Sequence, residues 1–252
     1  MGSQLTAWAI DLDGVIWRGI ETVPGAPEAV ATLRDRGTPI AFVTNSAART
    51  PAQVAEKLAF HGIPDAEDLV ITAAMAAASM IDPKAAVFVI GGDGVRQAIV
   101  ERGASLVRGP EADTVVVGIS AEFDYAMLAE AMRAIRSGAR FIATNDDSTF
   151  PDAAGLLPGN GALVAAVAAC SEVAPEIAGK PHEPIAAFVR ERLGSSGVMV
   201  GDRPETDGLF AASVGYDFAL VLSGVIGTED LPVVPAPRFV APDILSLLEQ
   251  LG

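Results

Sequence analysis

Cysteine and histidine are scarce in this chain of 252 residues, which has one cysteine and two histidines. A single cysteine excludes an internal disulfide framework and is typical of a reducing compartment. Two histidines argue against a histidine-based metal site. Cys170 closes the apolar, alanine-rich run 162–170, so we expect it to pack in a helix rather than to act as a nucleophile.

Basic residues are also few, with 17 Lys and Arg against 32 Asp and Glu and a net charge of −15. This excess of acid argues against nucleic acid or an anionic membrane surface as a partner, because both require clustered basic residues. An anionic substrate would have to be held by a metal and a few well-placed donors. The chain also lacks a basic, then apolar leader and any apolar stretch of membrane-spanning length. We therefore expect a cytoplasmic, soluble protein.

Half of the residues are hydrophobic, and they form short apolar runs separated by helix-like segments. Alternation of strand and crossover helix predicts an α/β fold with a parallel sheet and helices on its faces. The expected strands are 8–10, 39–43, 69–71, 87–90, 115–117, 141–143, 198–200 and 218–222. Because no fixed-period repeat is present, the middle third is interpreted as an inserted domain. The predicted division is 1–80, 81–176 and 177–252.

The most informative pattern is Asp11-Leu12-Asp13-Gly14, which directly follows the apolar run 7–10. Two carboxylates at the end of a buried strand cost too much desolvation to serve packing. Like charges this close need a cation or a proton between them. A divalent metal bound by oxygen, with one carboxylate free to attack phosphorus, satisfies this requirement. The alternative is a helix cap at Asp13 beside a surface acid.

Three further polar segments follow predicted strands or begin helices. They are Thr44-Asn45-Ser46, Lys180 within Gly179-Lys180-Pro181, and Asp202 and Asp207 within the run 201–207. In open parallel sheets, ligands bind beyond the carboxyl ends of the strands, where these segments would meet. Taken singly, Lys180 is equally consistent with a solvated lysine, and the two acids with helix capping. Together they indicate phosphoryl transfer, which depends on positioning and charge neutralisation.

These four segments resemble the motifs of the haloacid dehalogenase superfamily of phosphohydrolases, and more narrowly its NagD and p-nitrophenylphosphatase-like branch. The resemblance covers almost the whole chain and is carried by the motifs Asp11-Leu12-Asp13-Gly14-Val15 with the aromatic Trp17 and Gly19, Val43-Thr44-Asn45, Phe141-Ile142-Ala143-Thr144-Asn145-x-Asp147, Pro158-Gly159-x-Gly161, Gly179-Lys180-Pro181, Gly201-Asp202-Arg203-x-x-Thr206-Asp207 and Val221-Leu222-Ser223-Gly224-Val225. It implies a Rossmann-like parallel-sheet core with an inserted, smaller α/β cap.

The resemblance also implies a Mg²⁺-dependent, two-step hydrolysis of a small phosphorylated metabolite. Asp11 would become an aspartyl-phosphate, while Asp13 would protonate the leaving alcohol and then activate water. The implied Mg²⁺ ligands are the Asp11 and Asp202 carboxylates and the Asp13 backbone carbonyl. Asp207 would orient Lys180 or a metal-bound water. The implied phosphate and substrate contacts come from Thr44, Asn45, Ser46, Lys180 and Asp147.

Several points stay open at this stage. The loop 144–151 is either a specificity element or an acidic, self-capping turn. Ser46 and Gly208 depart from the residues usual in the branch, Asn and Ile. A phospho-accepting signalling domain and a sugar-phosphate mutase use a similar acid cluster. The physiological substrate is undetermined, and the resemblance leaves a homodimer through the cap open.

Overall fold

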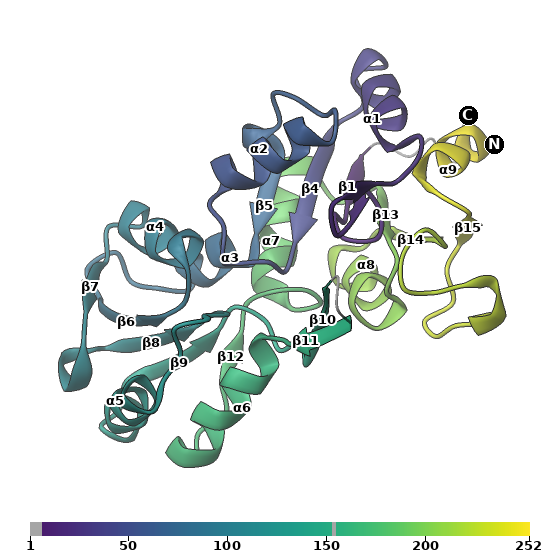
Figure 1. Cartoon of the computed structure of the whole chain (residues 1–252). Coiled ribbons are helices and arrows are strands. Elements are labelled where there is room, and N and C mark those ends of the chain that lie inside the picture. The colour runs from purple at the N-terminus through teal and green to yellow at the C-terminus, as the bar shows by residue number, and fades with distance from the viewer. Residues whose placement is uncertain (1–6, 153–154) are drawn as a thin grey trace. The chain divides into compact units, whose positions relative to one another are not determined.

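The computed structural model describes residues 7–152 and 155–252. Its chain forms two compact units (Figure 1). Unit 1 comprises Met1–Thr44, Ala52–Ile71 and Lys180–Gly252, and unit 2 comprises Asn45–Pro51 and Thr72–Gly179. The short segment Asn45–Pro51 therefore belongs to unit 2, although both of its flanks belong to unit 1. The predicted division into a core and an inserted cap stays a prediction.

Unit 1 is built on a six-stranded sheet with the order β15-β14-β13-β1-β4-β5. Its strands are β1 (Trp8–Ile10), β4 (Ile40–Thr44), β5 (Val70–Thr72), β13 (Val198–Gly201), β14 (Asp217–Val221) and β15 (Phe239–Ala241). The described pairings of β1 with β4 and β13, of β13 with β14 and of β14 with β15 are all parallel. The predicted parallel α/β arrangement is confirmed.

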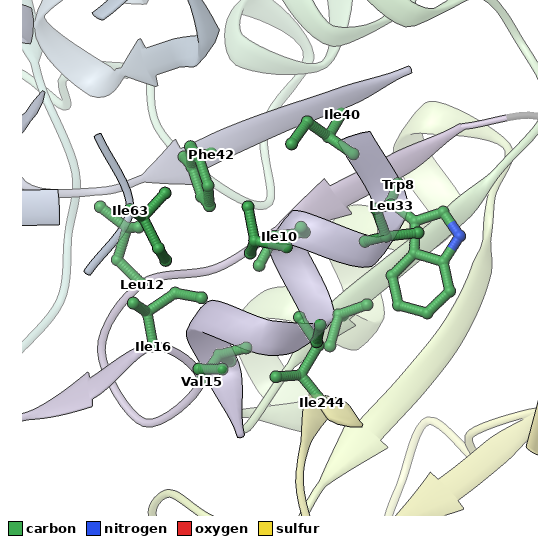
Figure 2. Packing of buried hydrophobic residues seen from close by; sticks show 14 of the residues in the cluster. Trp8, Ile10, Leu12, Val15, Ile16, Leu33, Ile40, Phe42, Ile63 and Ile244 are labelled. Atoms are coloured by element: carbon green, nitrogen blue, oxygen red, sulfur yellow. The ribbon is translucent and has the colours of Figure 1, made fainter. Parts of the chain in front are cut away.

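Helices cover both faces of this sheet, because both faces of its inner strands are apolar. The helices of unit 1 are α1 (Ala26–Asp35), α2 (Pro51–Phe60), α7 (Glu183–Leu193), α8 (Leu209–Val214) and α9 (Ile244–Leu251). Residues of α1, α2 and α9 share one core with alternate residues of the strands, and Figure 2 shows Ile10 of β1 within this core. Helices α7 and α8 contact the strands from the other face. This double cover explains why β1, β4 and β13 are buried along their whole length.

Unit 2 has its own five-stranded parallel sheet with the order β12-β9-β8-β6-β7. Its strands are β6 (Ala86–Ile90), β7 (Ser105–Val107), β8 (Thr114–Val117), β9 (Arg140–Ala143) and β12 (Glu176–Ile177). Its helices are α3 (Ala73–Ser79), α4 (Asp93–Glu101), α5 (Tyr125–Arg136) and α6 (Asn160–Ser171). A separate apolar core forms between the sheet and α5 and α6. Cys170 lies near the end of α6, where it is half-buried.

Two short hairpins were not predicted from the sequence. In unit 2, β10 (Thr149–Asp152) pairs antiparallel with β11 (Gly155–Pro158), so the segment expected as an open loop through Pro151 ends in a strand. In unit 1, β2 (Trp17–Arg18) pairs with β3 (Glu21–Thr22). Proline within a short run argues against a strand, which explains why the first hairpin gave no signal.

Polar side chains cap the starts of three helices. The side chains of Thr72, Asp124 and Asp243 accept hydrogen bonds from the backbone at the starts of α3, α5 and α9. The chain after β13 forms a π-helical turn, Pro204–Gly208, which runs directly into α8. Short 3₁₀ turns lie at Glu67–Leu69, Gly109–Glu111 and Thr228–Asp230. Among the described residues, no helix has the length and hydropathy needed to cross a membrane.

Candidate active site

The carboxyl ends of three adjacent strands in unit 1 carry polar residues. Asp11 follows β1, Thr44 is the last residue of β4, and Asp202 follows β13. The backbone N–H of Asp11 donates to the carbonyl of Val200 at 2.9 Å, which extends the β1–β13 ladder by one residue. The sheet therefore presents Asp11 and Asp202 from neighbouring strands at one edge. Both residues, and Thr44, are buried.

Lys180 joins this edge through two buried ion pairs. Its Nζ donates to Asp11 Oδ1 at 2.6 Å and to Asp207 Oδ1 at 2.7 Å. Only 2% of the Lys180 side chain is exposed. Lys180 lies three residues before α7, and Asp207 lies in the π-helical turn after β13. Lys180 thus contacts Asp11, which lies 169 positions away in the sequence, and Asp207, which lies 27 positions away.

Asp207 has a second backbone contact that fixes its carboxylate. Its Oδ2 accepts from the N–H of Arg203 at 3.1 Å. A Cβ atom at Gly201 would lie 2.2 Å from the same oxygen, so only glycine at the end of β13 leaves room for this carboxylate. With one oxygen on Lys180 and the other on the backbone, Asp207 is placed to orient the lysine.

Asp202 is seated differently, because one of its oxygens has no protein partner. Its Oδ2 accepts from the N–H of Val225 at 2.8 Å. Cβ atoms at Gly14 and Gly224 would lie 2.3 and 2.0 Å from that oxygen, so both glycines are needed for its close approach. The remaining oxygen, Oδ1, is buried without a hydrogen bond. A buried carboxylate oxygen in this state is a position where a ligand is expected.

The acidic cluster is defined here as Asp11, Lys180, Asp202 and Asp207, and its electrostatics indicate an unbalanced charge. When all four are ionised, three carboxylates and one ammonium leave a net charge of −2. Burial raises the pKa of Asp11 well above its ordinary value despite the opposing effect of Lys180. Burial, followed by the charge of Asp207, raises the pKa of Asp202 to about 7. Burial alone would lower the pKa of Lys180, but Asp11 and Asp207 outweigh it and raise this pKa.

These residues fit a hard divalent cation. Asp11, Asp202 and Asp207 each offer a carboxylate oxygen, and the three oxygens lie within 4.8 Å of one another. Oxygen ligands are those that Mg²⁺ prefers, and a charge of +2 would balance the cluster. In a salt-bridge network that serves only stability, every buried carboxylate oxygen would have a partner. Asp202 Oδ1 has none, and this distinguishes the cluster from such a network. The buried sequence-predicted acids and Lys180 are thus brought together in unit 1.

Asp13 stands apart from the three buried acids. Its side chain is exposed, and its Oδ1 accepts a hydrogen bond from the indole Nε1 of Trp17 at 2.8 Å. Asp13 is not one of the three residues whose carboxylate oxygens converge. This placement is compatible with the expectation that Asp13 would reach a metal only through its backbone carbonyl.

The remaining predicted residues, Asn45, Ser46 and Asp147, belong to unit 2. Asn45 Nδ2 donates to Asp147 Oδ2 at 3.1 Å, so the structure joins two residues that the sequence placed in separate motifs. Asn145 reinforces this contact, since its Nδ2 donates to the carbonyl of Asn45 at 2.8 Å and its Oδ1 accepts from the N–H of Asp147 at 3.1 Å. The Ser46 side chain is exposed.

Asn160 completes this network, and sequence reasoning missed its role. It is the first residue of α6, and it is buried. Its Nδ2 donates to the carbonyls of Val117 and Asn145 at 3.1 and 2.7 Å, and to Thr144 Oγ1 at 3.3 Å. We call Asn45, Asn145, Asp147 and Asn160 the amide cluster. The only available signal was the motif Pro158-Gly159-x-Gly161, which brackets Asn160 without indicating what it binds.

Packing explains why Gly208 stands where the branch usually has isoleucine. A Cβ atom there would lie 2.7 Å from Pro235 Cγ and 3.0 Å from Phe218 Cε1. The space that a larger residue would need is already filled by these two side chains. Gly208 therefore changes the packing behind Asp207 without altering the contacts of Asp207 with Lys180 and Arg203.

Comparison with known proteins agrees with this geometry. Residues 8–105 match the family model described as haloacid dehalogenase-like hydrolase, and residues 177–247 match the model described as HAD-hydrolase-like. The chain is 44% identical to the 5'-nucleotidase YutF of Bacillus subtilis (strain 168) over 230 aligned residues. The alignment covers 89% of this chain and 90% of that protein.

Two solved structures are also similar. The p-nitrophenyl phosphatase from Archaeoglobus fulgidus has a TM-score of 0.92 and 30% identity, covering 98% of this chain and 100% of that one. The glycerol phosphate phosphatase Rv1692 from Mycobacterium tuberculosis, in complex with magnesium, has a TM-score of 0.90 and 33% identity, covering 97% and 77%. The chain belongs to the haloacid dehalogenase-like hydrolase family. The predicted family, fold class and enzyme class, a phosphoric monoester hydrolase, are confirmed.

Proposed function

We propose that this chain is a Mg²⁺-dependent phosphatase that hydrolyses a small phosphorylated metabolite through a phosphoryl-Asp11 intermediate. The observation that carries the proposal is the acidic cluster, in which three buried carboxylates and one lysine have a net charge of −2 when ionised and Asp202 Oδ1 has no hydrogen-bond partner. The magnesium named with the mycobacterial neighbour supports the choice of metal. The phosphatase and nucleotidase names of the relatives support the reaction.

The metal would be held by the carboxylates of Asp11 and Asp202 and by the backbone carbonyl of Asp13. When bound, it neutralises phosphoryl charge and orients the ester for in-line attack. Asp11 Oδ2 is the candidate nucleophile, since Oδ1 is taken by Lys180. Attack forms a bond from this oxygen to phosphorus and breaks the bond to the leaving oxygen, which takes a proton from Asp13. Asp13 then removes a proton from the water that attacks phosphorus and regenerates Asp11.

The other residues bind and position. Lys180 balances the charge of Asp11 and of the phosphoryl group, and Asp207 keeps the lysine in place through the ion pair at 2.7 Å. Thr44, Asn45 and Ser46 would donate to phosphoryl oxygens. In this proposal unit 2 acts as the cap, and Asp147, held by Asn45, contacts the part of the substrate beyond the phosphate. A cytoplasmic location and a homodimer through unit 2 are part of the same proposal.

The decisive experiment is phosphate release from p-nitrophenyl phosphate, nucleoside 5'-monophosphates, sugar phosphates and glycerol phosphate, with Mg²⁺ and with EDTA. We expect turnover of at least one ester that EDTA abolishes and Mg²⁺ restores. Asp11→Asn should lower this turnover by at least about 10³-fold, because the amide is not a nucleophile. Activity that survives Asp11→Asn would refute the covalent route.

The same assay separates the two alternative functions. A signalling domain would accumulate a long-lived phosphoprotein without turnover. A mutase would interconvert sugar phosphates without releasing phosphate. Either result would overturn the proposal, whereas steady release of inorganic phosphate supports it.

A further inference from the structure

We propose that Trp17 is a positioning residue that holds the side chain of Asp13 in place for proton transfer. The inference rests on the proposed phosphatase function, in which Asp13 is the proton carrier. Its basis is the hydrogen bond of 2.8 Å from Trp17 Nε1 to Asp13 Oδ1. The indole N–H donates only, so it can orient a carboxylate without competing for the transferred proton. Asp13 Oδ2 is then the oxygen placed for proton transfer.

The backbone places these two residues together. The loop after β1 winds tightly, with the N–H groups of Ile16 and Trp17 donating to the carbonyl of Leu12 at 2.8 and 3.3 Å. The N–H of Gly14 donates to the carbonyl of Trp17 at 2.7 Å. This turn leads the chain back to Asp13 within four residues. Trp17 is therefore fixed by the same loop that carries both Asp11 and Asp13.

The Trp17 ring is itself held by its surroundings. Only 3% of the residue is exposed. The ring stacks on that of His61, with centroids 5.0 Å apart and an interplanar angle of 24°, and Lys57 Nζ lies 4.0 Å from the Trp17 ring centroid. His61 is anchored in turn by a hydrogen bond of 2.8 Å between its Nδ1 and Thr22 Oγ1. A buried indole usually directs its N–H to a partner, and here the partner is the exposed Asp13.

This arrangement answers a need of the proposed mechanism. An exposed aspartate can adopt several side-chain conformations, and proton transfer requires one of them within hydrogen-bond distance of the leaving oxygen. A rigid donor at 2.8 Å reduces that freedom before substrate binds. Trp17 touches neither the phosphate nor the metal in the proposed scheme, so it acts only through Asp13.

The test uses two esters that differ in how much they need a proton. Phenyl phosphate releases a poor leaving group that requires protonation, whereas p-nitrophenolate leaves readily without it. Trp17→Phe keeps an aromatic ring but removes the donor. We expect kcat/KM for phenyl phosphate to fall about 10- to 100-fold and that for p-nitrophenyl phosphate to change less than about 3-fold. KM for both esters should be nearly unchanged.

Matched variants make the result specific. Trp8→Phe alters the only other tryptophan, which lies in the core of unit 1, and should leave the ratio of the two kcat/KM values unchanged. In an Asp13→Asn background, Trp17→Phe should have no further effect on that ratio, because the group that it positions is gone. Equal losses for both esters, or additive effects of the two substitutions, would assign Trp17 a merely structural role and overturn the proposal.

A second readout does not depend on activity or on the folding of Trp17→Phe. In the Trp8→Phe protein, Trp17 is the sole tryptophan fluorophore. Asp13→Asn in this background should shift its emission maximum, whereas Asp35→Asn, at the end of α1, should not. Identical emission from the two variants would disprove the contact. If the wild-type protein hydrolysed none of the panel of esters with Mg²⁺, the proposed function would fail, and the emission shift would still decide whether Trp17 holds Asp13.

Discussion

The acidic cluster of unit 1 and the amide cluster of unit 2 differ in the partners of their buried polar groups. In the acidic cluster, one lysine faces three carboxylates, and Asp202 Oδ1 is left without a partner. In the amide cluster, side-chain amides donate to backbone carbonyls, to a hydroxyl and to the Asp147 carboxylate, and Asn160 Nδ2 alone makes three hydrogen bonds, although Asn160 Oδ1 is buried without one. Buried ion pairs contribute little net stability, whereas side-chain amides hydrogen-bonded to several loops hold those loops together. The first cluster is suited to bind a cation, and the second to fix loops.

The largest effect expected from this comparison is that of Lys180→Met. Removing one partner of a buried ion pair typically costs about 3–5 kcal/mol, because the remaining charge is left uncompensated. Here two carboxylates, Asp11 and Asp207, would lose their partner. We expect urea unfolding with EDTA at pH 7.5 to show a loss of this size. The loss should be smaller at pH 5, because burial raises the pKa of Asp11 and this carboxyl group can take up a proton there.

Lys84→Met is the control, since Lys84 is exposed and its replacement should change the free energy of unfolding by less than about 0.5 kcal/mol. A similar small effect for Lys180→Met would mean that the buried pairs are not formed. The acidic cluster would then not differ from an ordinary charged surface.

The next largest effect is a difference between alanine substitutions at two glycines of the same loop region, Gly14 and Gly19. Gly14 and Gly19 both have positive φ angles, +84° and +62°. A Cβ atom at Gly14 would lie 2.3 Å from Asp202 Oδ2, but one at Gly19 would meet nothing within 4 Å. Gly19→Ala should therefore cost about 1 kcal/mol from the backbone alone. Gly14→Ala should cost more and should also displace Asp202.

The displacement can be measured as a change in metal requirement. Disturbing the support of a metal ligand typically weakens metal affinity about 10- to 100-fold. The Mg²⁺ concentration for half-maximal turnover should rise by this factor in Gly14→Ala and stay constant in Gly19→Ala. Equal behaviour of the two variants would contradict the placement of Asp202 in the metal site.

A third effect concerns the amide cluster. Asn160→Ala removes three hydrogen bonds and should lower the free energy of unfolding by about 2 kcal/mol. Asn160→Asp, which is similar in size but has fewer donors, should cost more, because it buries a charge. Both variants should leave the Mg²⁺ concentration for half-maximal turnover unchanged. A changed metal requirement would show that the two clusters are not functionally separate.

The contrast between the clusters also explains what the sequence could reveal. Asp11 and Asp202 were found because an acid directly after a buried strand is costly unless it has a function. β1, β4 and β13 were found because strands covered on both faces are continuous apolar runs. Asn160 gave no such signal, since a neutral amide has a modest burial cost, and its partners lie 15 to 43 residues away.

Other features were hidden for different physical reasons. The bond that seats Asp202 comes from the backbone N–H of Val225, and a backbone group carries no side-chain signature. The hairpin of β10 and β11 contains two prolines, and proline argues against a strand when a segment is assigned from its own sequence alone. The membership of Asn45–Pro51 in unit 2 depends on long-range contacts, including the bond of 3.1 Å from the N–H of Gly94 to the carbonyl of Ala48.

The smallest effect concerns His61, a buried base of unit 1 that lies outside the acidic cluster. Burial, followed by the charge of Lys57, lowers the pKa of His61 from 6.5, and its Nε2 is buried without a hydrogen bond. Because the unfolded chain binds this proton more readily, the contribution of His61 to stability is present above pH 6.5 and is lost as the pH falls below it. His61→Phe keeps a ring against Trp17 but cannot titrate, so its free energy of unfolding should depend less on pH between 7 and 5.5 than that of the wild type. His182→Phe, which alters the only other histidine, should retain the wild-type dependence. If the two variants lost stability in parallel with the wild type on acidification, neutral burial of His61 would be wrong, and the pH response of unit 1 would have to come from its carboxylates.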